Sequence, residues 1–409
     1  METVRLQEGV FLHIRRTKAF KENRIDLYFT KPLNETTRAR CLLLSAMIPE
    51  AGENLHEKRK LISALDALYG ARLSIRTFTV GANNCLLISL SALQKTYVQE
   101  EILLPQWQLL ARLLNPSFSQ RQLDEAKQQA FFNTMEERED PDANSRQEVL
   151  RLCPDAVRFK ANPTPESYET VSLADIQNEF TDLLQQGRID ICAIIDTDPD
   201  KFLSILNRTV SFTPRQGAVI APAAGKTMRK RTRQVRRKSL QSALAQLYDT
   251  GIVLSDARMP ALMLANGILG ALPTSLLFQE VRERNSLCYA IDSELYLYDG
   301  LLQITAQMRP ANRAAVADLI QKQIARVQQG DFPDTLLSEA KKIYADNGRG
   351  ARDSLDVCSR EMLIEALLNK PALHTRIQRA FSRISRKDIM LASTAWRCRA
   401  NFVQQGKEV

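Results

Sequence analysis

Apolar and polar residues alternate along several short stretches in the first half of the chain, and a period of two residues predicts β-strands. The first two stretches are separated by a polar turn near residues 21–23, and the next two by a turn at 81–84. The second of these pairs predicts a β-hairpin. The strands predicted in this half are 9–15, 24–30, 73–80, 85–93 and 188–196.

Between these strands, apolar residues recur three or four positions apart, which is the spacing of an α-helix. Pro49 and Gly52 end the first of these helices and Gly70 ends the second, because proline and glycine interrupt helical backbone. The helices predicted in this half are 39–48, a helix through Leu61, Leu65 and Leu68, 100–114, and 120–138, followed by further helices to about residue 185.

The second half of the chain predicts the same order of elements in outline. Strand-like sequence lies within 240–254, and residues 287–297 and 301–307 predict a hairpin. The other elements predicted here are helices 261–272, 274–284, 312–328, a helix from Leu336 and 385–395, with a closing strand near 400–404. Each half therefore predicts an α+β layer, a mainly antiparallel sheet packed with helices.

Repeated motifs relate the two halves. The pattern F-x4-L-x-E-A-K occurs at residues 118–127 and again at 332–341, an offset of 214. The sequence S-L-A-D-I at 172–176 is echoed by S-R-K-D-I at 385–389, an offset of 213. Two matches at nearly one offset predict two tandem homologous domains. The expected parts are a first domain at 1–213, a basic linker at 214–238 and a second domain at 239–409.

The composition is that of an ordinary globular protein, with 44% hydrophobic and 25% charged residues among 409. No apolar signal segment is visible at the start, and the longest apolar run, 261–272, is too short to cross a bilayer. Seven cysteines form no C-x-x-C pair and mostly have apolar neighbours. We therefore expect reduced core cysteines, a cytoplasmic location and no membrane association.

Residues 226–238 hold eight basic residues and no acidic one. Clusters of this kind neutralise phosphates in nucleic-acid-binding proteins, so RNA or ribosome binding is one hypothesis. No aromatic residue is interleaved for base stacking, and a solvated linker has the same charge pattern. The pattern favours an interdomain linker and disfavours nucleic acid as a partner.

The chain has only three histidines, His13, His56 and His374, and no two of them lie three or four residues apart. A zinc site built on one helix needs that spacing so that two imidazoles reach one ion. No G-x-S-x-G nucleophile elbow is present either. The histidines therefore predict neither a self-sufficient metal site nor a Ser–His–Asp triad.

The most suggestive stretch is 278–290, which contains Arg282 and Tyr289. One interpretation is structural, since arginine is favoured at a helix end and tyrosine is a common strand residue. The other is functional, since a cation and a phenol that converge from two elements can hold a peptide carbonyl or a carboxylate.

The run L-F-Q-E-V-R-E-R-N-S-L-C-Y at 277–289, in the second copy of a duplicated α+β domain, resembles the pitrilysin/insulinase family of zinc peptidases. The resemblance covers nearly the whole chain. In that family the first domain carries H-x-x-E-H and a later Glu; the two His and the later Glu hold zinc, and the motif's Glu activates water. The second half carries an Arg and a Tyr that contact substrate, and the resemblance assigns these roles to Arg282 and Tyr289.

The first half departs from the family's pattern, because the helix that should carry the motif reads C-L-L-L-S-A-M at 41–47. The residues at the ligand and base positions are Leu42, Ser45, Ala46 and Asn133, with Glu136 or Glu137 in place of Asn133 if the alignment slips. A leucine cannot ligate zinc and a serine cannot replace the carboxylate base. We therefore expect no cofactor in this chain and no peptidase activity from it alone.

Some bacterial members of the family are two-chain enzymes, in which one chain brings zinc and the other the Arg–Tyr pair. Residues 68–71 (L-Y-G-A) and 277–289 resemble the YmfF-like proteins of Gram-positive bacteria. Those proteins are paired with a YmfH-like chain that bears H-x-x-E-H, and they have been linked to modification of elongation factor P. The resemblance implies a non-catalytic subunit that contacts a peptide or protein substrate in a heterodimer, with zinc in the partner chain.

Two other functions stay open at this point. One is a structural or scaffolding homologue with no proteolysis anywhere in its complex, because loss of the zinc motif is also expected of an assembly core. The other is the RNA- or ribosome-associated protein considered for residues 226–238.

Overall fold

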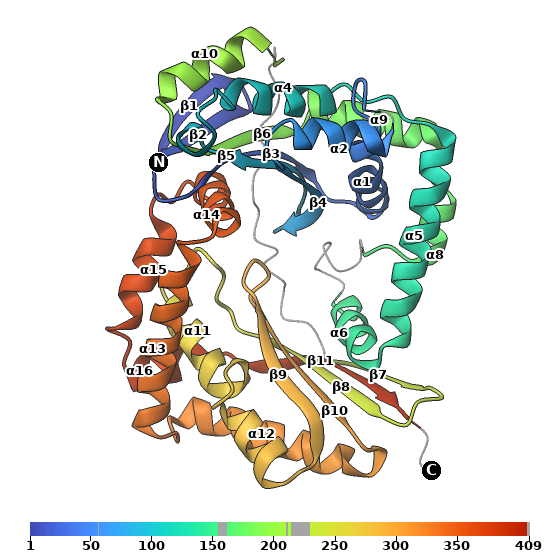
Figure 1. Cartoon of the computed structure of the whole chain (residues 1–409). Coiled ribbons are helices and arrows are strands. Elements are labelled where there is room, and N and C mark those ends of the chain that lie inside the picture. The colour runs from blue at the N-terminus through green and yellow to red at the C-terminus, as the bar shows by residue number, and fades with distance from the viewer. Residues whose placement is uncertain (56, 154–161, 210–211, 214–229, 407–409) are drawn as a thin grey trace. The chain divides into compact units, whose positions relative to one another are not determined.

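The computed structural model describes residues 1–55, 57–153, 162–209, 212–213 and 230–406. The contacts within the chain divide it into two compact units, and each unit is built around one sheet (Figure 1). The first unit comprises residues 1–134, 161–220 and 351–371, and the second comprises 135–160, 221–350 and 372–409.

The first unit contains a six-stranded sheet in the order β1-β2-β6-β3-β5-β4. Its strands are β1 (Glu2–Gln7), β2 (Val10–Arg16), β3 (Glu22–Pro32), β4 (Arg72–Val80), β5 (Asn83–Leu93) and β6 (Arg188–Ile195). Its helices are α1 (Glu35–Met47), α2 (Lys58–Asp66), α3 (Lys95–Val98), α4 (Leu103–Leu113), α8 (Pro165–Glu169), α9 (Leu173–Gln185), α10 (Pro199–Thr209) and α14 (Leu355–Leu367), and α5 (Gln120–Glu139) begins in it.

The second unit contains a five-stranded sheet in the order β7-β11-β8-β10-β9. Its strands are β7 (Arg231–Arg236), β8 (Ser242–Asp249), β9 (Cys288–Tyr296), β10 (Leu301–Met308) and β11 (Arg397–Gln405). Its helices are α6 (Pro141–Arg151), α11 (Met259–Asn266), α12 (Arg313–Gln329), α13 (Asp334–Ala351), α15 (Leu373–Phe381) and α16 (Arg386–Ser393). Two π-helical segments, η2 (Gly267–Ala271) and η3 (Phe278–Arg284), lie within the predicted helices 261–272 and 274–284.

The two sheets have the same topology, which confirms the duplicated, mainly antiparallel α+β fold. In the first sheet β2 and β6 are parallel and the other neighbouring strands are antiparallel. In the second sheet β7 and β11 are parallel. The other neighbouring strands, β11 with β8, β8 with β10 and β10 with β9, are antiparallel. Strands β2, β6, β3, β5 and β4 therefore correspond to β7, β11, β8, β10 and β9, and β1 has no counterpart among the described residues.

The repeated sequence motifs occupy equivalent positions in the two units. The F-x4-L-x-E-A-K motifs enter α5 and α13, as predicted. Ser172 and Ser385 cap α9 and α16, and each hydroxyl accepts a hydrogen bond from the backbone N–H of the aspartate three residues later. Hydrogen bonds from these serines lower the pKa of both capping-box carboxyls, Asp175 and Asp388.

A third repeat becomes visible with the structure, because D-x-x-S-R occurs in α6 at 142–146 and in α14 at 356–360, again 214 residues apart. α6 packs on β8, β10 and β11, and α14 packs on β3 and β6. Each helix thus belongs to the unit built mainly from the other half of the sequence. The compact units therefore differ from the expected contiguous domains, 1–213 and 239–409.

Two further differences concern the strands. The predicted strands 9–15 and 24–30 are β2 and β3, but they are not neighbours, because β6 returns from the end of the first half and pairs with both. In the expected linker, residues 214–229 lie outside the described residues, whereas 231–236 form β7. Five of the six residues of β7 are exposed, so no alternation of apolar and polar residues marks the strand.

The cysteines have the environments that their sequence neighbours predict. All seven are free, and all except the half-buried Cys398 are buried. Over the part of the chain that the structure describes, no helix has both the length and the apolar composition needed to cross a bilayer.

Candidate substrate-contact site

Arg282 and Tyr289 lie on either side of one tight turn in the second unit. Arg282 is in η3, and Tyr289 is the second residue of β9. Ser286 between them has a left-handed backbone with φ of 51°, and its N–H donates to the carbonyl of Arg282 at 3.1 Å. The structure therefore brings the two residues of the predicted pair to the same turn.

The guanidinium of Arg282 is held by stacking rather than by a close ion pair. Its carbon Cζ lies 4.8 Å from the centroid of the Phe278 ring, and its Nε is 3.8 Å from a carboxylate oxygen of Glu283. The side chain is 44% exposed. Stacking on an aromatic face leaves the in-plane N–H groups of arginine available for an added carbonyl or carboxylate.

The charge of Arg282 also acts at the start of β9. Burial raises the pKa of the Cys288 thiol to about 11, and the positive charge of Arg282 opposes that rise. Cys288 directly precedes Tyr289, so the cation acts beside the strand that carries the phenol.

The phenol of Tyr289 has a second cation as its neighbour. Tyr289 is 48% exposed, and its hydroxyl accepts a hydrogen bond from Nε of Arg309 at 3.2 Å. This hydrogen bond raises the pKa of Arg309. Arg309 follows β10 directly, and the register of the hairpin places Met308 opposite Cys288. The sequence pattern does not single out Arg309, because only the pairing of β9 with β10 brings it to Tyr289.

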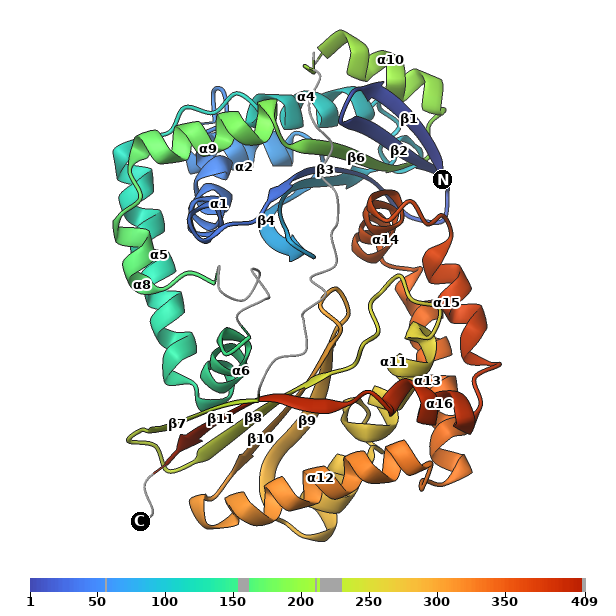
Figure 2. The same cartoon turned by 180° about the vertical axis from the view of Figure 1, so that it is seen from behind.

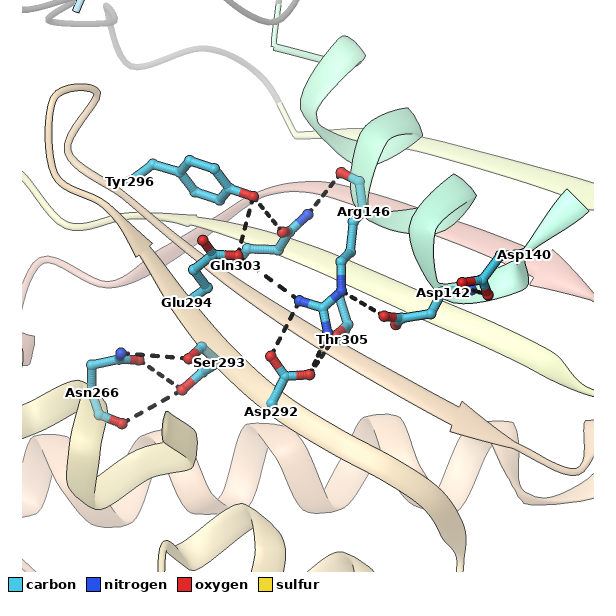
Figure 3. Close-up of polar contacts among 10 residues, drawn as sticks. All are labelled: Asp140, Asp142, Arg146, Asn266, Asp292, Ser293, Glu294, Tyr296, Gln303 and Thr305. Carbon is cyan, nitrogen blue, oxygen red and sulfur yellow. Dashed lines mark hydrogen bonds and ion pairs between the residues drawn. The ribbon is translucent and has the colours of Figure 1, made fainter. Parts of the chain in front are cut away.

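A polar network fastens β9 to α6 on one face of the sheet (Figure 3). Nη2 and Nη1 of Arg146 donate to the two carboxylate oxygens of Asp292 at 2.5 and 3.1 Å, and its Nε donates to Asp142 at 2.7 Å. The hydroxyl of Thr305 on β10 donates to Asp292 at 2.9 Å. These contacts join α6, β9 and β10 through one guanidinium and one carboxylate.

The same network continues through amide and phenol groups. The side chain of Gln303 is fully buried, and its Nε2 donates to the backbone carbonyl of Arg146 at 2.8 Å. Its Oε1 accepts a hydrogen bond from the hydroxyl of Tyr296 at 2.8 Å (Figure 3). Burial by itself lowers the pKa of Arg146, but hydrogen bonds and charges from Asp292 and Asp142 outweigh it and raise that pKa. Arg146 therefore remains a cation in this network.

The opposite face of β9 is held by close packing against η2. The Ser293 hydroxyl donates to the side-chain oxygen of Asn266 at 2.7 Å. A Cβ atom added to Gly270 would lie 2.5 Å from the Ser293 hydroxyl oxygen, so any larger residue there would displace the Ser293 side chain. β9, the strand that carries Tyr289, thus has side-chain contacts on both faces, with α6 on one face and with Asn266 and η2 on the other.

The residues at the family's zinc positions lie on α1 and α5. Leu42 and Ser45 are half-buried and Ala46 is exposed, and the Ser45 hydroxyl donates to the carbonyl of Leu42 at 2.7 Å. Asn133 is exposed, and its side-chain oxygen accepts a hydrogen bond from Gln129 at 2.7 Å.

These residues do not fit a zinc ion, since leucine and alanine have no donor atom and the serine hydroxyl is used within its own helix. The alternative Glu137 accepts a hydrogen bond from Gln147 and, like Glu136, is exposed. Among the residues that the structure describes, no group of three or more His, Cys, Asp or Glu side chains is arranged to hold a metal ion.

Comparison with known proteins places the chain among peptidase homologues. Residues 170–344 match the family described as "Peptidase M16 inactive domain". The chain is 23% identical over 349 residues to the probable inactive metalloprotease YmfF of Bacillus subtilis (strain 168), which covers 82% of this chain and 81% of that protein.

Two solved structures share the fold over almost their whole length. A conserved protein from Enterococcus faecalis V583 superimposes with a TM-score of 0.91 at 22% identity, over 99% of this chain and 98% of that one. The peptidase M16 inactive domain from Pseudomonas fluorescens superimposes with a TM-score of 0.81 at 17% identity, over 100% and 98% of the two chains.

These matches agree with the degenerate residues on α1. The family match is to an inactive domain, and the matched relative is named an inactive metalloprotease. The resemblance to the pitrilysin/insulinase peptidases that residues 277–289 predict is confirmed. The chain is therefore similar to the inactive homologues of the pitrilysin/insulinase peptidases, and its own helix α1 lacks the zinc motif of that family.

Proposed function

We propose that the chain is the substrate-contacting subunit of a two-chain, insulinase-type peptidase complex whose other subunit carries H-x-x-E-H. The observation that supports this most directly is the turn at 285–287, which presents Arg282 and Tyr289 together while the zinc positions on α1 are degenerate. The family works on peptide and protein substrates, so a peptide backbone is the ligand for which these donors are suited.

In this proposal the residues of this chain bind and orient the peptide. The guanidinium of Arg282 donates to a substrate carbonyl or to the oxyanion that develops from it, and the Tyr289 hydroxyl donates to a second acceptor. Arg309, which donates to the phenolic oxygen, leaves the phenolic hydrogen free to point at the substrate. The partner's zinc would supply the activated water.

Reconstitution of the complex tests the proposal. We expect the tagged chain to co-purify from its native cells with a near-stoichiometric chain that bears H-x-x-E-H, and the pair to cleave peptides. Loss of a single oxyanion donor costs about 100-fold in kcat, and we expect that loss for Arg282→Ala and for Tyr289→Phe. Unchanged activity of both variants in an assembled pair would refute the assigned roles.

The matched control is Arg284→Ala. Arg284 is in the same segment η3, but its guanidinium pairs with Glu280 at 2.7 Å, within the helix. This variant removes one positive charge from the same neighbourhood and should keep nearly full activity. A loss equal to that of Arg282→Ala would show that net charge, not the position of the donor, is what the complex needs.

The resemblance to YmfF gives the proposal a cellular setting. We propose that the complex works in the cytoplasm, where the free, buried cysteines would stay reduced. We further propose that it is linked to modification of elongation factor P. Intact-mass measurement of elongation factor P from cells that lack this chain tests that link, and an unchanged mass would exclude it.

A scaffold without proteolysis is the second candidate, and the loss of every zinc ligand on α1 favours it. The two candidates differ in the partner's sequence and in turnover. Recovery of a stoichiometric partner without H-x-x-E-H, or of an H-x-x-E-H pair that cleaves no peptide, would support the scaffold and refute the peptidase complex.

A further inference from the structure

The second unit has a basic strand at the edge of its sheet. β7 is the outermost strand in the order β7-β11-β8-β10-β9, and it runs parallel to β11 with Arg231 opposite Ala400 and Arg236 opposite Gln405 (Figures 1 and 2). The peptidase site proposed above makes no use of it. β7 and its flanking residues contain the described part of the basic run noted in the sequence.

Comparison with the first unit shows what this edge could accommodate. There, β2 is the counterpart of β7, and β1 pairs antiparallel with the outer edge of β2, with Glu2 opposite Ile14. Among the described residues, no strand pairs with the outer edge of β7. The position that β1 fills in the first sheet is therefore open in the second, as far as the described chain extends.

The backbone groups that point outward can be assigned from one hydrogen bond. The N–H of Arg237 donates to the carbonyl of Gln405 at 3.0 Å, so Arg237 points toward β11. Peptide groups alternate in direction along a strand, so the N–H and C=O groups of Thr232, Gln234 and Arg236 point away from β11. Three residues thus present an unpaired donor and acceptor each on the described edge.

Positive side chains surround this edge. Arg231, Arg236, Arg237 and Lys238 are exposed, and no carboxylate pairs with any of them in the described structure. Arg233 is the member of β7 that forms an ion pair, with Glu148 at 2.6 Å. An isolated row of cations repels itself, and an added negative strand would remove that repulsion.

A protein segment suits the edge better than RNA does. Residues 230–238 contain no aromatic side chain on which a base could stack. Leu240, a few residues beyond β7, is 72% exposed and offers an apolar contact of the kind found at protein interfaces. The open backbone edge forms hydrogen bonds with a strand, and these have no equivalent in a phosphate backbone.

We propose that β7 is a docking edge for an acidic, extended peptide segment of a partner protein, which adds to the sheet as an outer strand. Backbone hydrogen bonds to Thr232, Gln234 and Arg236 would set its register. Its carboxylates would pair with the exposed arginines and Lys238. This inference does not depend on the proposed peptidase complex.

The first experiment measures binding of labelled peptides to the full chain by fluorescence anisotropy. The probe is a twelve-residue peptide that alternates Glu with Val and Thr. We expect saturable binding that weakens at least tenfold, as an order-of-magnitude expectation, in the variant Arg231→Glu with Arg236→Glu. The control variant, Arg59→Glu with Lys322→Glu, changes the net charge equally at exposed positions on α2 and α12, outside β7, and should bind as the original chain does.

A second probe separates strand addition from general attraction of charge. The same peptide N-methylated at alternate residues keeps its carboxylates but loses one row of backbone donors, and we expect binding to fall about tenfold. Thr232→Pro, which removes one outward N–H, should weaken the unmethylated peptide and leave thermal unfolding nearly unchanged.

Several results would overturn the proposal. Equal binding of the methylated and unmethylated peptides would show charge attraction without strand pairing. Absence of peptide binding would show that the arginines only protect the edge against self-association. Salt-sensitive binding of poly(U) that is lost in the Arg231→Glu, Arg236→Glu variant, without peptide binding, would assign the edge to RNA.

Discussion

Arg146 of α6 holds Asp292 of β9 through two hydrogen bonds, at 2.5 and 3.1 Å, although 145 residues separate them in the chain. Tyr289 is the second residue of strand β9, and helix α6 comes from the first half of the sequence. The Arg146–Asp292 contact therefore attaches a helix from the first half of the sequence to a strand from the second half (Figure 3). That strand, β9, also carries Tyr289, one of the two candidate substrate-contact residues.

The first prediction concerns the stability of this link. Arg146→Ala leaves Asp292 and Asp142 close together without their cation, and both side chains are partly exposed, so we expect a loss of about 1–2 kcal/mol in the free energy of unfolding. Urea unfolding measures it. The control Arg121→Ala removes an exposed i,i+4 pair with Glu125 and should cost less than about 0.5 kcal/mol. Equal losses in the two variants would contradict a special role for Arg146.

The second prediction concerns Arg309 as a positioning residue. In an active assembled complex, Arg309→Ala should lower kcat because the phenol of Tyr289 loses the donor that orients it, and Arg309→Lys should recover part of the rate. The double variant with Tyr289→Phe should be no slower than Tyr289→Phe alone, since both changes affect one phenolic oxygen. Additive losses would show that Arg309 acts independently of Tyr289.

The third prediction concerns pH and the buried pair of His13 and Asp190. Burial alone would raise the pKa of Asp190, but hydrogen bonds from His13 at 2.9 Å and from Arg188 at 2.7 Å outweigh it and lower that pKa. A depressed carboxyl pKa contributes stability that is present above about pH 4, the unfolded value, and is lost as the pH falls through the lower folded value.

Asp190→Asn should therefore destabilise the chain by about 3 kcal/mol at pH 7, because the guanidinium of Arg188, whose side chain is only 13% exposed, loses its charged partner. It should also flatten the fall in stability below pH 4. Urea unfolding at pH 7 and in steps below pH 4 measures both effects. Asp198→Asn is the control, since its pair with Arg16 is 3.5 Å long and 57% exposed on each side. A parallel pH dependence in Asp190→Asn and the original chain would contradict the assigned cause.

The fourth prediction concerns the degenerate zinc positions. The purified chain should hold well under about 0.1 zinc per molecule by elemental analysis, because the side chains on α1 offer no ligand set. Restoring the family residues with Leu42→His, Ser45→Glu, Ala46→His and Asn133→Glu should raise uptake toward one ion per chain. A variant without Asn133→Glu should bind more weakly, since it lacks the third protein ligand.

Either of two results would count against this alignment of the zinc positions. Near-stoichiometric zinc in the original chain would reveal a site built from other residues. Failure of the four-residue variant to bind zinc, while it unfolds like the original chain, would show that these positions do not converge.

The strands and helices were largely predictable because each has a periodic face. β5 pairs with its predicted hairpin partner β4, and the F-x4-L-x-E-A-K motifs enter helices α5 and α13 as predicted. β7 could not be recognised from the sequence because its side chains are exposed on both faces, so its local pattern resembles that of a linker. The position of β6 between β2 and β3 was also hidden, since strand order depends on contacts across more than 150 residues.

The candidate site divides in the same way. Arg282 and Tyr289 belong to one continuous run, so a motif of thirteen letters could indicate them, and Leu42, Ser45 and Ala46 reveal a missing ligand set by residue type alone. The sequence by itself thus determined the duplicated α+β fold and the absence of a zinc motif, because periodicity and side-chain chemistry are local properties. Only the tertiary structure decided that α6 and α14 are exchanged between units, that Arg146 clamps Asp292 and that Arg309 reaches Tyr289, because these contacts arise from packing and strand pairing between segments far apart in the chain.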